Sequence, residues 1–187
     1  MAGVNPRERL LNAAIEHIAE RGISDLSLRE LAAAIGSSHR MLIHHFGGRE
    51  GLLVAVVQEV EARQRALIDG VVADPTASPG DAMRAWWKHI SDASLWPNER
   101  LFFELYGQAL QGRPGTVAML DGIVDSWLEP AASVLTQLGF ADGEATARLG
   151  IAVTRGLLLD LLATRDRERV DAAMEVHIAA LEALLRR

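Results

Sequence analysis

The stretch from Ser38 to Phe46 carries the side chains best suited to contact a nucleic acid. It reads Ser-His-Arg-Met-Leu-Ile-His-His-Phe, so hydrogen-bonding and apolar groups lie close together. An arginine can donate two hydrogen bonds to a guanine edge, and Met or Ile can lie against a thymine methyl group. The positions with this capacity are His39, Arg40, Met41, Ile43, His44 and His45. If a helix presents them outward, the stretch predicts contacts with base edges.

A short helix is predicted just before this stretch. Ser27 followed by Glu30 is a capping-box pattern, in which the Ser oxygen accepts a backbone N–H and the Glu reaches back to the cap. Apolar residues then keep helical spacing at Leu28, Leu31, Ala32 and Ile35. Gly36 is expected to end the helix in the left-handed conformation.

A second short helix is predicted over the stretch itself. Ser37 or Ser38 can cap it, and Leu42 and Phe46 lie four residues apart on its inner face. Two short helices joined by a tight Gly-containing turn form a helix-turn-helix. From the spacing alone, a small α-hairpin with a solvated polar face is an equally good interpretation.

The segment from Arg9 to Leu53 resembles the amino-terminal domain of the tetracycline-repressor (TetR) family. The resemblance covers about a quarter of the chain, and the matching positions are Arg9 to Ala14, Gly22, Leu26 to Arg29, Leu31, Ala32, Gly36, Leu42, His45, Phe46, Arg49, Glu50, Leu52 and Leu53. It implies a helix-turn-helix DNA-binding domain over residues 1–48 and a helical effector-binding and dimerisation domain over residues 49–187. Four positions depart from the family pattern: the family usually has a small residue and Thr where Arg40 and Met41 stand, Tyr where Ile43 stands, and Lys where Arg49 stands.

The resemblance and the residue types together predict the DNA contacts. We expect the major groove to be read by Arg29, Ser38, His39, Arg40, Met41 and His44, and phosphates to be contacted by Ser27 and Arg49. Loss of the family's Tyr at Ile43 removes one expected phosphate contact. Because Arg40 and Met41 are unusual for the family, the operator sequence of a relative cannot be assumed for this chain.

Composition limits the other function classes. The net charge is −6, but residues 1–50 hold six Arg and six acidic residues, so that domain is neutral. The chain has no Cys and none of the glycine-rich phosphate loops or the Gly-x-Ser-x-Gly nucleophile motif, so we expect neither an enzyme nor a metal or other cofactor. No stretch of 18 apolar residues and no signal-peptide pattern occurs, which predicts a cytoplasmic protein without a membrane partner.

Helical periodicity continues through the rest of the chain and predicts an all-α fold. The expected helices are Arg7 to Arg21 (closed by Gly22), Arg49 to Val72, Asp81 to Ala93, Pro97 to about Gly112, Pro114 to Leu138 with a bend at Pro130, Asp142 to Thr164, and Arg167 to Arg187. The segment Asp74 to Gly80 is rich in helix breakers and predicts a loop.

Aromatic residues gather in the middle of the chain. All four Trp, the single Tyr and three of the four Phe lie between Trp86 and Phe140. Aromatic stripes at helical spacing are usually core, but with a few polar groups they also suit a ligand site. The expected ligand-binding set is Met83, Trp86, Trp87, His89, Phe102, Phe103, Tyr106, Met119, Trp127 and Arg155.

The last two predicted helices carry wide apolar stripes. These either cover their own domain or form an intersubunit four-helix bundle, as the family resemblance implies. The expected dimer residues are Ile151, Thr154, Leu158, Leu161, Met174, Ile178, Leu181 and Leu185. The sequence thus predicts a homodimeric repressor, released from a palindromic double-stranded DNA operator by a small apolar or aromatic effector. The alternative is a helical small-molecule-binding or interaction protein without specific DNA reading.

Overall fold

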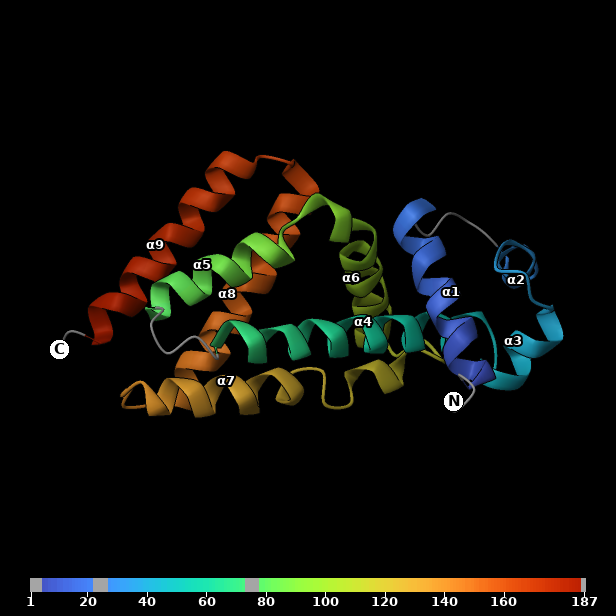
Figure 1. Cartoon of the computed structure of the whole chain (residues 1–187), viewed down its shortest axis with the longest axis horizontal. Helices are drawn as coiled ribbons and strands as arrows, with labels where there is room; N and C mark the ends of the chain where they lie inside the picture. Colours follow the sequence, from blue (N-terminus) through green and yellow to red (C-terminus); the bar gives the residue numbers. More distant parts are fainter. Residues whose placement is uncertain (1–4, 22–26, 73–77, 186–187) are drawn as a thin grey trace. The chain divides into compact units, whose positions relative to one another are not determined.

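The computed structural model describes residues 5–21, 27–72 and 78–185, and its regular structure is helical (Figure 1). No strand occurs in these ranges, which confirms the all-α prediction. The helices are α1 (Pro6–Arg21), α2 (Leu28–Ala34), α3 (His39–Phe46), α4 (Arg49–Val72), α5 (Pro79–Ile90), η1 (Ala93–Leu95), α6 (Trp96–Leu110), η2 (Val117–Leu120), α7 (Asp125–Gln137), α8 (Gly143–Thr164) and α9 (Arg167–Leu185). The predicted role of Gly22 and most of the predicted loop, residues 74–77, lie outside the described residues.

One predicted helix is wrong. The expected continuous helix from Pro114 to Leu138 is instead the 3₁₀ turn η2 followed by α7. Gly115 and Gly122 flank η2 with φ angles of 86° and 68°. Left-handed glycines of this kind end helices, so the apolar spacing spans two elements.

The start of α5 differs from its prediction at Asp81 for a local reason. The Ser78 hydroxyl oxygen accepts a hydrogen bond from the Asp81 backbone N–H at 3.1 Å. Pro79 then fits the first helical position, where a missing N–H costs nothing. The helix therefore begins at Pro79, two residues before its predicted start.

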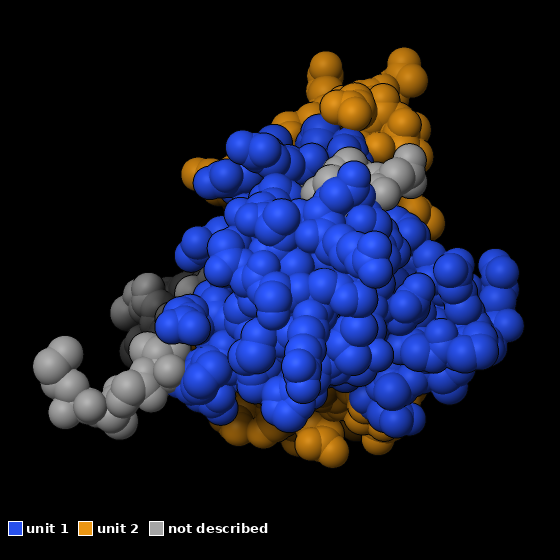
Figure 2. Space-filling model, turned by 90° about the vertical axis from the view of Figure 1, so that its right-hand side faces the viewer, with its two compact units in different colours: residues 1–63, 93–121 blue, residues 64–92, 122–187 orange. Residues whose placement is uncertain are grey.

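The described chain packs into two compact units (Figure 2). Unit 1 comprises residues 1–63 and 93–121, and unit 2 comprises residues 64–92 and 122–187. The division falls inside α4, between Arg63 and Gln64. The units follow packing, and α6 joins unit 1 because it packs on α1. The functional boundary after residue 48 stays a prediction.

Unit 1 is built on the apolar faces of α1, α4 and α6. Its buried side chains include Leu10, Ala14, Ile18, Leu42, Leu52, Val56, Leu101 and Leu105. Arg63 on α4 forms an ion pair with Glu59 at 2.9 Å and donates a hydrogen bond to Asn12 on α1. The Arg63 hydrogen bond joins the middle of α4 to α1.

In unit 2, α7 lies along α8, and α9 packs on both α5 and α8 (Figure 1). The buried side chains include Trp87, Ile90, Leu128, Leu158, Leu161, Val170, Met174 and Ile178. Arg84 of α5 forms ion pairs with Glu175 and Glu182 of α9, at 3.0 and 3.5 Å. None of the described helices is both long and apolar enough to span a lipid bilayer.

Candidate functional site

The cap of α2 is formed as predicted. The Ser27 hydroxyl oxygen accepts the Glu30 backbone N–H at 3.3 Å, and the Glu30 carboxylate accepts the Ser27 N–H at 2.8 Å. These hydrogen bonds with Ser27 lower the pKa of the Glu30 carboxyl. Ile35 ends the helix and Gly36 follows with φ of 65°, which confirms the predicted left-handed turn. Together they set the entry into α3.

Removing this cap is expected to destabilise the protein. Ser27→Ala leaves a backbone N–H of α2 without its acceptor, which typically costs about 0.5–2 kcal/mol. Urea denaturation should show that loss, whereas Ser27→Asp, which keeps an acceptor oxygen, should unfold close to wild type. Equal destabilisation by both substitutions would contradict a capping role.

The second helix, α3, is held by its own cap and by one buried side chain. The Ser38 hydroxyl oxygen accepts the Met41 N–H at 3.2 Å, and Gly47 ends the helix with φ of 77°. Leu42 is fully buried, and the half-buried Phe46 ring lies beneath the Arg7 guanidinium, 5.1 Å from its carbon. This inner face agrees with its prediction, so the rotation of α3 is fixed.

The opposite face of α3 is exposed. Arg40 and His44 are open to solvent, and Met41 and Ile43 keep 40% and 44% of their surface accessible. The face therefore offers an arginine fork and apolar groups together, the combination that base edges in a major groove can accept.

The other predicted DNA contacts lie around this face. Arg29 is exposed on α2, His39 is half-buried at the start of α3, and Arg49 is half-buried at the start of α4. The Ser27 and Ser38 oxygens already accept cap hydrogen bonds, but each hydroxyl keeps a proton that it can donate to a phosphate.

His44 and His45 contact each other on α3. Their rings meet edge to face, with centroids 4.9 Å apart, and His45 continues against Phe46 at 6.3 Å. Within the described ranges no three His, Asp or Glu side chains are arranged to hold an ion. His45 is thus partly an inner-face residue, whereas His44 belongs to the exposed face.

The ten predicted ligand-binding residues fall into both units. Phe102, Phe103, Tyr106 and Met119 belong to unit 1, where the Phe102 and Tyr106 rings stack at 5.6 Å. The remaining six belong to unit 2: Met83, Trp86, Trp87, His89, Trp127 and Arg155. Sequence reasoning could not divide them, because it sees aromatic spacing but not which helices pack together.

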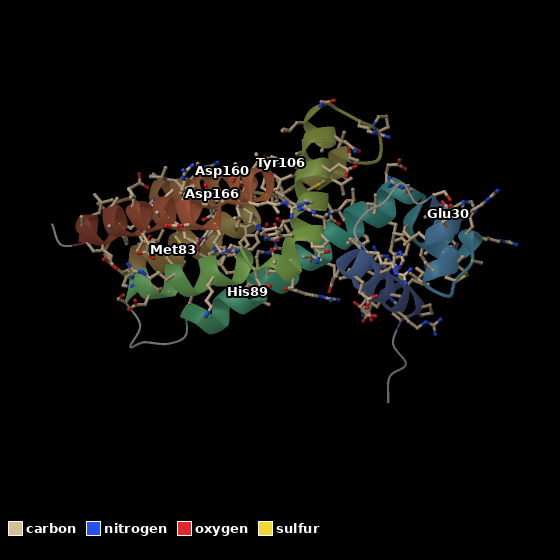
Figure 3. The ribbon with its side chains drawn as sticks, turned by 90° about the horizontal axis from the view of Figure 1, so that it is seen from above. Glu30, Met83, His89, Tyr106, Asp160 and Asp166 are labelled. Carbon is tan, nitrogen blue, oxygen red and sulfur yellow. The ribbon has the colours of Figure 1, made fainter. Side chains whose placement is uncertain are left out.

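In unit 2 the aromatic residues of α5 meet the start of α7. The Trp86 ring lies 5.6 Å from Trp127 and 5.9 Å from His89, and Figure 3 shows Met83 and His89 along α5. Trp87 points elsewhere: it is buried, and its indole Nε1–H donates to Asp171 at 2.7 Å. Trp87 therefore has a core role, and Trp86 and Trp127 form the center of the cluster.

His177 of α9 is a polar group in this unit that the predicted ligand set omitted. Its Nε2 atom is buried without a hydrogen-bond partner among the described residues. Desolvation by burial lowers the pKa of this imidazole. Only the packing of α9 shows that the His177 imidazole is buried without a partner among the described residues, because in the sequence it stands among the apolar residues of a stripe.

This histidine is expected to make stability pH-dependent. Because its folded pKa is lowered, the unfolded chain binds the proton more tightly. Stability is therefore lost as the pH falls below the unfolded value of about 6.5 and toward the folded pKa. Urea denaturation at pH 7.5 and 5.5 should show a smaller acid loss for His177→Gln than for wild type. Parallel losses would contradict this role.

The predicted dimer residues mostly point into their own subunit. Thr154, Leu158, Leu161, Met174 and Ile178 are buried within the single chain, and Ile151, Leu181 and Leu185 are half-buried. A side chain already buried has little surface left for a partner. The five buried side chains of the predicted stripe therefore pack in the core of the single chain, and a dimer role for the other three stays a prediction.

The opposite faces of α8 and α9 are apolar and exposed. Leu149 and Leu159 on α8 keep 55% and 50% of their surface accessible, and Val176 and Leu184 on α9 keep 72% and 53%. Exposed small residues continue both faces at helical spacing: Ala152, Gly156, Ala163, Ala172, Ala179 and Ala183. The sequence already contains this second apolar stripe. On each helix its residues recur every three or four positions, next to the buried stripe that was predicted as the dimer contact.

Comparison with known proteins agrees with this arrangement. Residues 10–56 match the family model described as bacterial regulatory proteins, tetR family. The HTH-type transcriptional regulator BetI 1 of Chromohalobacter salexigens is 32% identical over 168 residues, covering 69% of this chain and 81% of that protein. The HTH-type transcriptional repressor AcnR of Corynebacterium efficiens is 38% identical over 89 residues, 46% of this chain and 47% of that protein.

A solved structure extends the likeness to the whole fold. The multidrug binding protein EbrR, complexed with imidazole, aligns with a TM-score of 0.67 and 26% identity, over 95% of this chain and 90% of that one. The helix-turn-helix with its exposed second helix lies within the part of the chain that matches these DNA-binding regulatory proteins. The chain belongs to the tetR family of bacterial transcriptional regulators.

Proposed function

We propose that two copies of this chain form a repressor that binds a palindromic operator through α3 and leaves it when a small effector binds. The exposed face of α3, with Arg40, Met41, Ile43 and His44 around a fully buried Leu42, is the observation that carries the proposal. The AcnR relative, named a repressor, supports the direction of regulation. The same role places the protein in the cytoplasm with DNA, and we propose no catalytic activity.

Each predicted DNA contact on and around the exposed face of α3 has a distinct expected role. Arg40 is the strongest candidate for a guanine contact, and Met41 and Ile43 are placed to meet thymine methyl groups. Ile43 stands where the family usually has a Tyr, so its exposed apolar surface exchanges a phosphate contact for a base contact. Arg29, Ser38, His39 and His44 complete the groove-facing set, while Ser27 and Arg49 contact phosphates.

We place the dimer contact on the exposed faces of α8 and α9. Leu149, Leu159, Val176 and Leu184 supply large apolar groups, and the alanines and glycine between them allow the helices of two subunits to approach closely. Two such helix pairs form a four-helix bundle with two-fold symmetry. The symmetry then presents two copies of α3 to two operator half-sites.

The effector is proposed to bind among the aromatic residues and to act through α4. This helix begins three residues after the end of α3, and it contains the division between the two units, at Arg63 and Gln64. A ligand shifts the structure only by its different affinity for the two states, and DNA must weaken the ligand by the same factor.

A gel shift with the DNA upstream of the protein's own gene tests the proposal. We expect a saturable complex that competitor DNA of unrelated sequence does not displace, with only a modest dependence on salt because residues 1–50 carry no net charge. A protein that shifts all duplexes equally, or none, would favour the alternative of a helical small-molecule-binding protein.

A further inference from the structure

The Trp127 indole is a buried hydrogen-bond donor that the protein leaves unused. Its Nε1 atom is shielded from solvent and has no hydrogen-bond partner among the described residues. Trp87 in the same unit differs, because its Nε1–H donates a hydrogen bond to Asp171 at 2.7 Å. Buried indole N–H groups are normally paired, so an unpaired one is a candidate to bind a group from outside the chain.

Flat rings surround this donor. The Trp86 centroid lies 5.6 Å from Trp127 with the two planes at 50°, and His89 lies 5.9 Å beyond Trp86. Such tilted rings offer faces and edges to a further aromatic ring. The surroundings of the unused donor therefore favour a planar, aromatic ligand.

Two cationic side chains lie near Trp127. The Arg65 guanidinium carbon lies 5.4 Å from the Trp127 ring centroid. Arg155 donates to the carbonyl of Ile123, one helical turn before Trp127, at 2.9 Å. A guanidinium is a cation with five N–H donors and no acceptor, so both side chains suit an acceptor rather than a donor.

The two carboxylates of α7 nearest to Trp127 lie away from its face. Asp125 and Glu129, the carboxylates of α7 nearest to Trp127, are both exposed. They lie two residues away on either side, and helix neighbours at that spacing point away from each other. Two guanidinium groups and an unpaired indole N–H therefore favour an acceptor with negative charge over a cation.

A second unpaired polar atom lies further along the same cluster. His177 Nε2 is 4.0 Å, and Met83 Cε 3.9 Å, from the point where a Cβ on Gly150 would stand. Met83 precedes Trp86 by one turn of α5, so the apolar surface continues from Trp86 to this neutral imidazole. A ligand with an aromatic body can therefore meet an imidazole nitrogen at its far end.

We infer that the effector is an aromatic carboxylate. Its ring lies against Trp86 and Trp127, and its carboxylate oxygens accept hydrogen bonds from the Trp127 indole N–H and from the guanidinium of Arg65 or Arg155. The inference rests on the proposed function, since it names the effector class of the same regulator.

Four probes with one ring system test the chemistry. Calorimetry on the full-length protein should rank 2-naphthoate first, 2-naphthamide second, and naphthalene and 2-naphthyltrimethylammonium last, with at least a tenfold gap between first and last. Equal or tighter binding of the trimethylammonium probe would overturn the inference, and so would binding of 2-naphthoate no tighter than that of naphthalene.

Variants locate the site. Trp127→Phe keeps a ring but removes the donor, so 2-naphthoate affinity should fall at least fivefold while naphthalene affinity changes less than twofold. Arg65→Gln should act in the same direction. Trp96→Phe makes the same chemical change in unit 1 and should have no effect. Wild-type affinity of correctly folded Trp127→Phe for 2-naphthoate would overturn the assignment.

The gel shift separates this inference from the proposed function. Saturating 2-naphthoate should release operator DNA from the wild-type protein and leave the Trp127→Phe complex intact. If DNA binds but 2-naphthoate does not release it, the effector assignment fails and the regulator survives. If no DNA binds specifically while 2-naphthoate still binds, the regulator proposal fails instead.

Discussion

A double substitution on the exposed faces of α8 and α9, Leu159→Glu with Val176→Glu, is expected to give a folded monomer with almost no operator binding. The two side chains keep 50% and 72% of their surface accessible in the single chain, so neither charge has to enter the subunit's own core. In the dimer each carboxylate would be buried without a partner, which is strongly unfavourable. Because linking two half-site contacts raises affinity by about 10²–10⁴, operator affinity should fall by at least that lower factor.

Sedimentation and gel shift together check this result. Leu110→Glu with Val117→Glu is the matched control, since it also places two acids at exposed apolar positions, 65% and 46% accessible, but outside α8 and α9. The control should stay dimeric and bind DNA. A dimeric Leu159→Glu/Val176→Glu protein would show that the contact lies elsewhere.

The second large effect is expected at Arg40. Arg40→Ala removes a side chain that is exposed at the outward face of α3 and that supports nothing in the core. A lost bidentate contact to guanine costs about 1–3 kcal/mol and relaxes the choice of base at one position. Fluorescence anisotropy on an operator and its single-base variants should show both effects.

Two further variants sharpen the Arg40 measurement. Arg40→Lys keeps the charge but not the planar fork, so it should lose most of the discrimination and less of the overall affinity. Arg113→Ala removes the same charge from an exposed position outside α3, α8 and α9 and should bind the operator normally. An Arg40→Ala protein that still ranks all the single-base variants as wild type does would exclude a role in base choice.

The sequence was informative where local chemistry decides the structure. The Ser27 and Glu30 pair, the turn at Gly36 and the buried Leu42 all depend on near neighbours, and each was found as predicted. The limits of α4 at Arg49 and Val72 also agreed, because a glycine pair precedes it and its apolar spacing is regular. The exposure of Arg40 and His44 followed from the same periodicity.

It was less informative where several faces of a helix are apolar. On α8, Leu158 and Leu161 form one stripe and Leu149 and Leu159 another, and only packing on α7 and α9 shows which is internal. Spacing likewise ran through Gly122, whose left-handed backbone separates η2 from α7. Partner helices distant in sequence decide such cases.

The aromatic residues illustrate the same limit. Trp86, Trp87 and Trp127 are alike in sequence, but Trp87 donates to Asp171 while the Trp127 donor has no partner among the described residues. Hydrogen-bond pairing over a separation of 84 residues distinguishes the two. No periodicity in the sequence could have done so.

The central claim is that two copies of α3 read duplex DNA in a symmetric assembly, and selection from a random duplex library tests it most directly. The wild-type protein should enrich an inverted repeat whose half-site centers lie about one helical turn, roughly 34–36 Å, apart. Enrichment of a single unrepeated site, or of no sequence at all, would contradict the account.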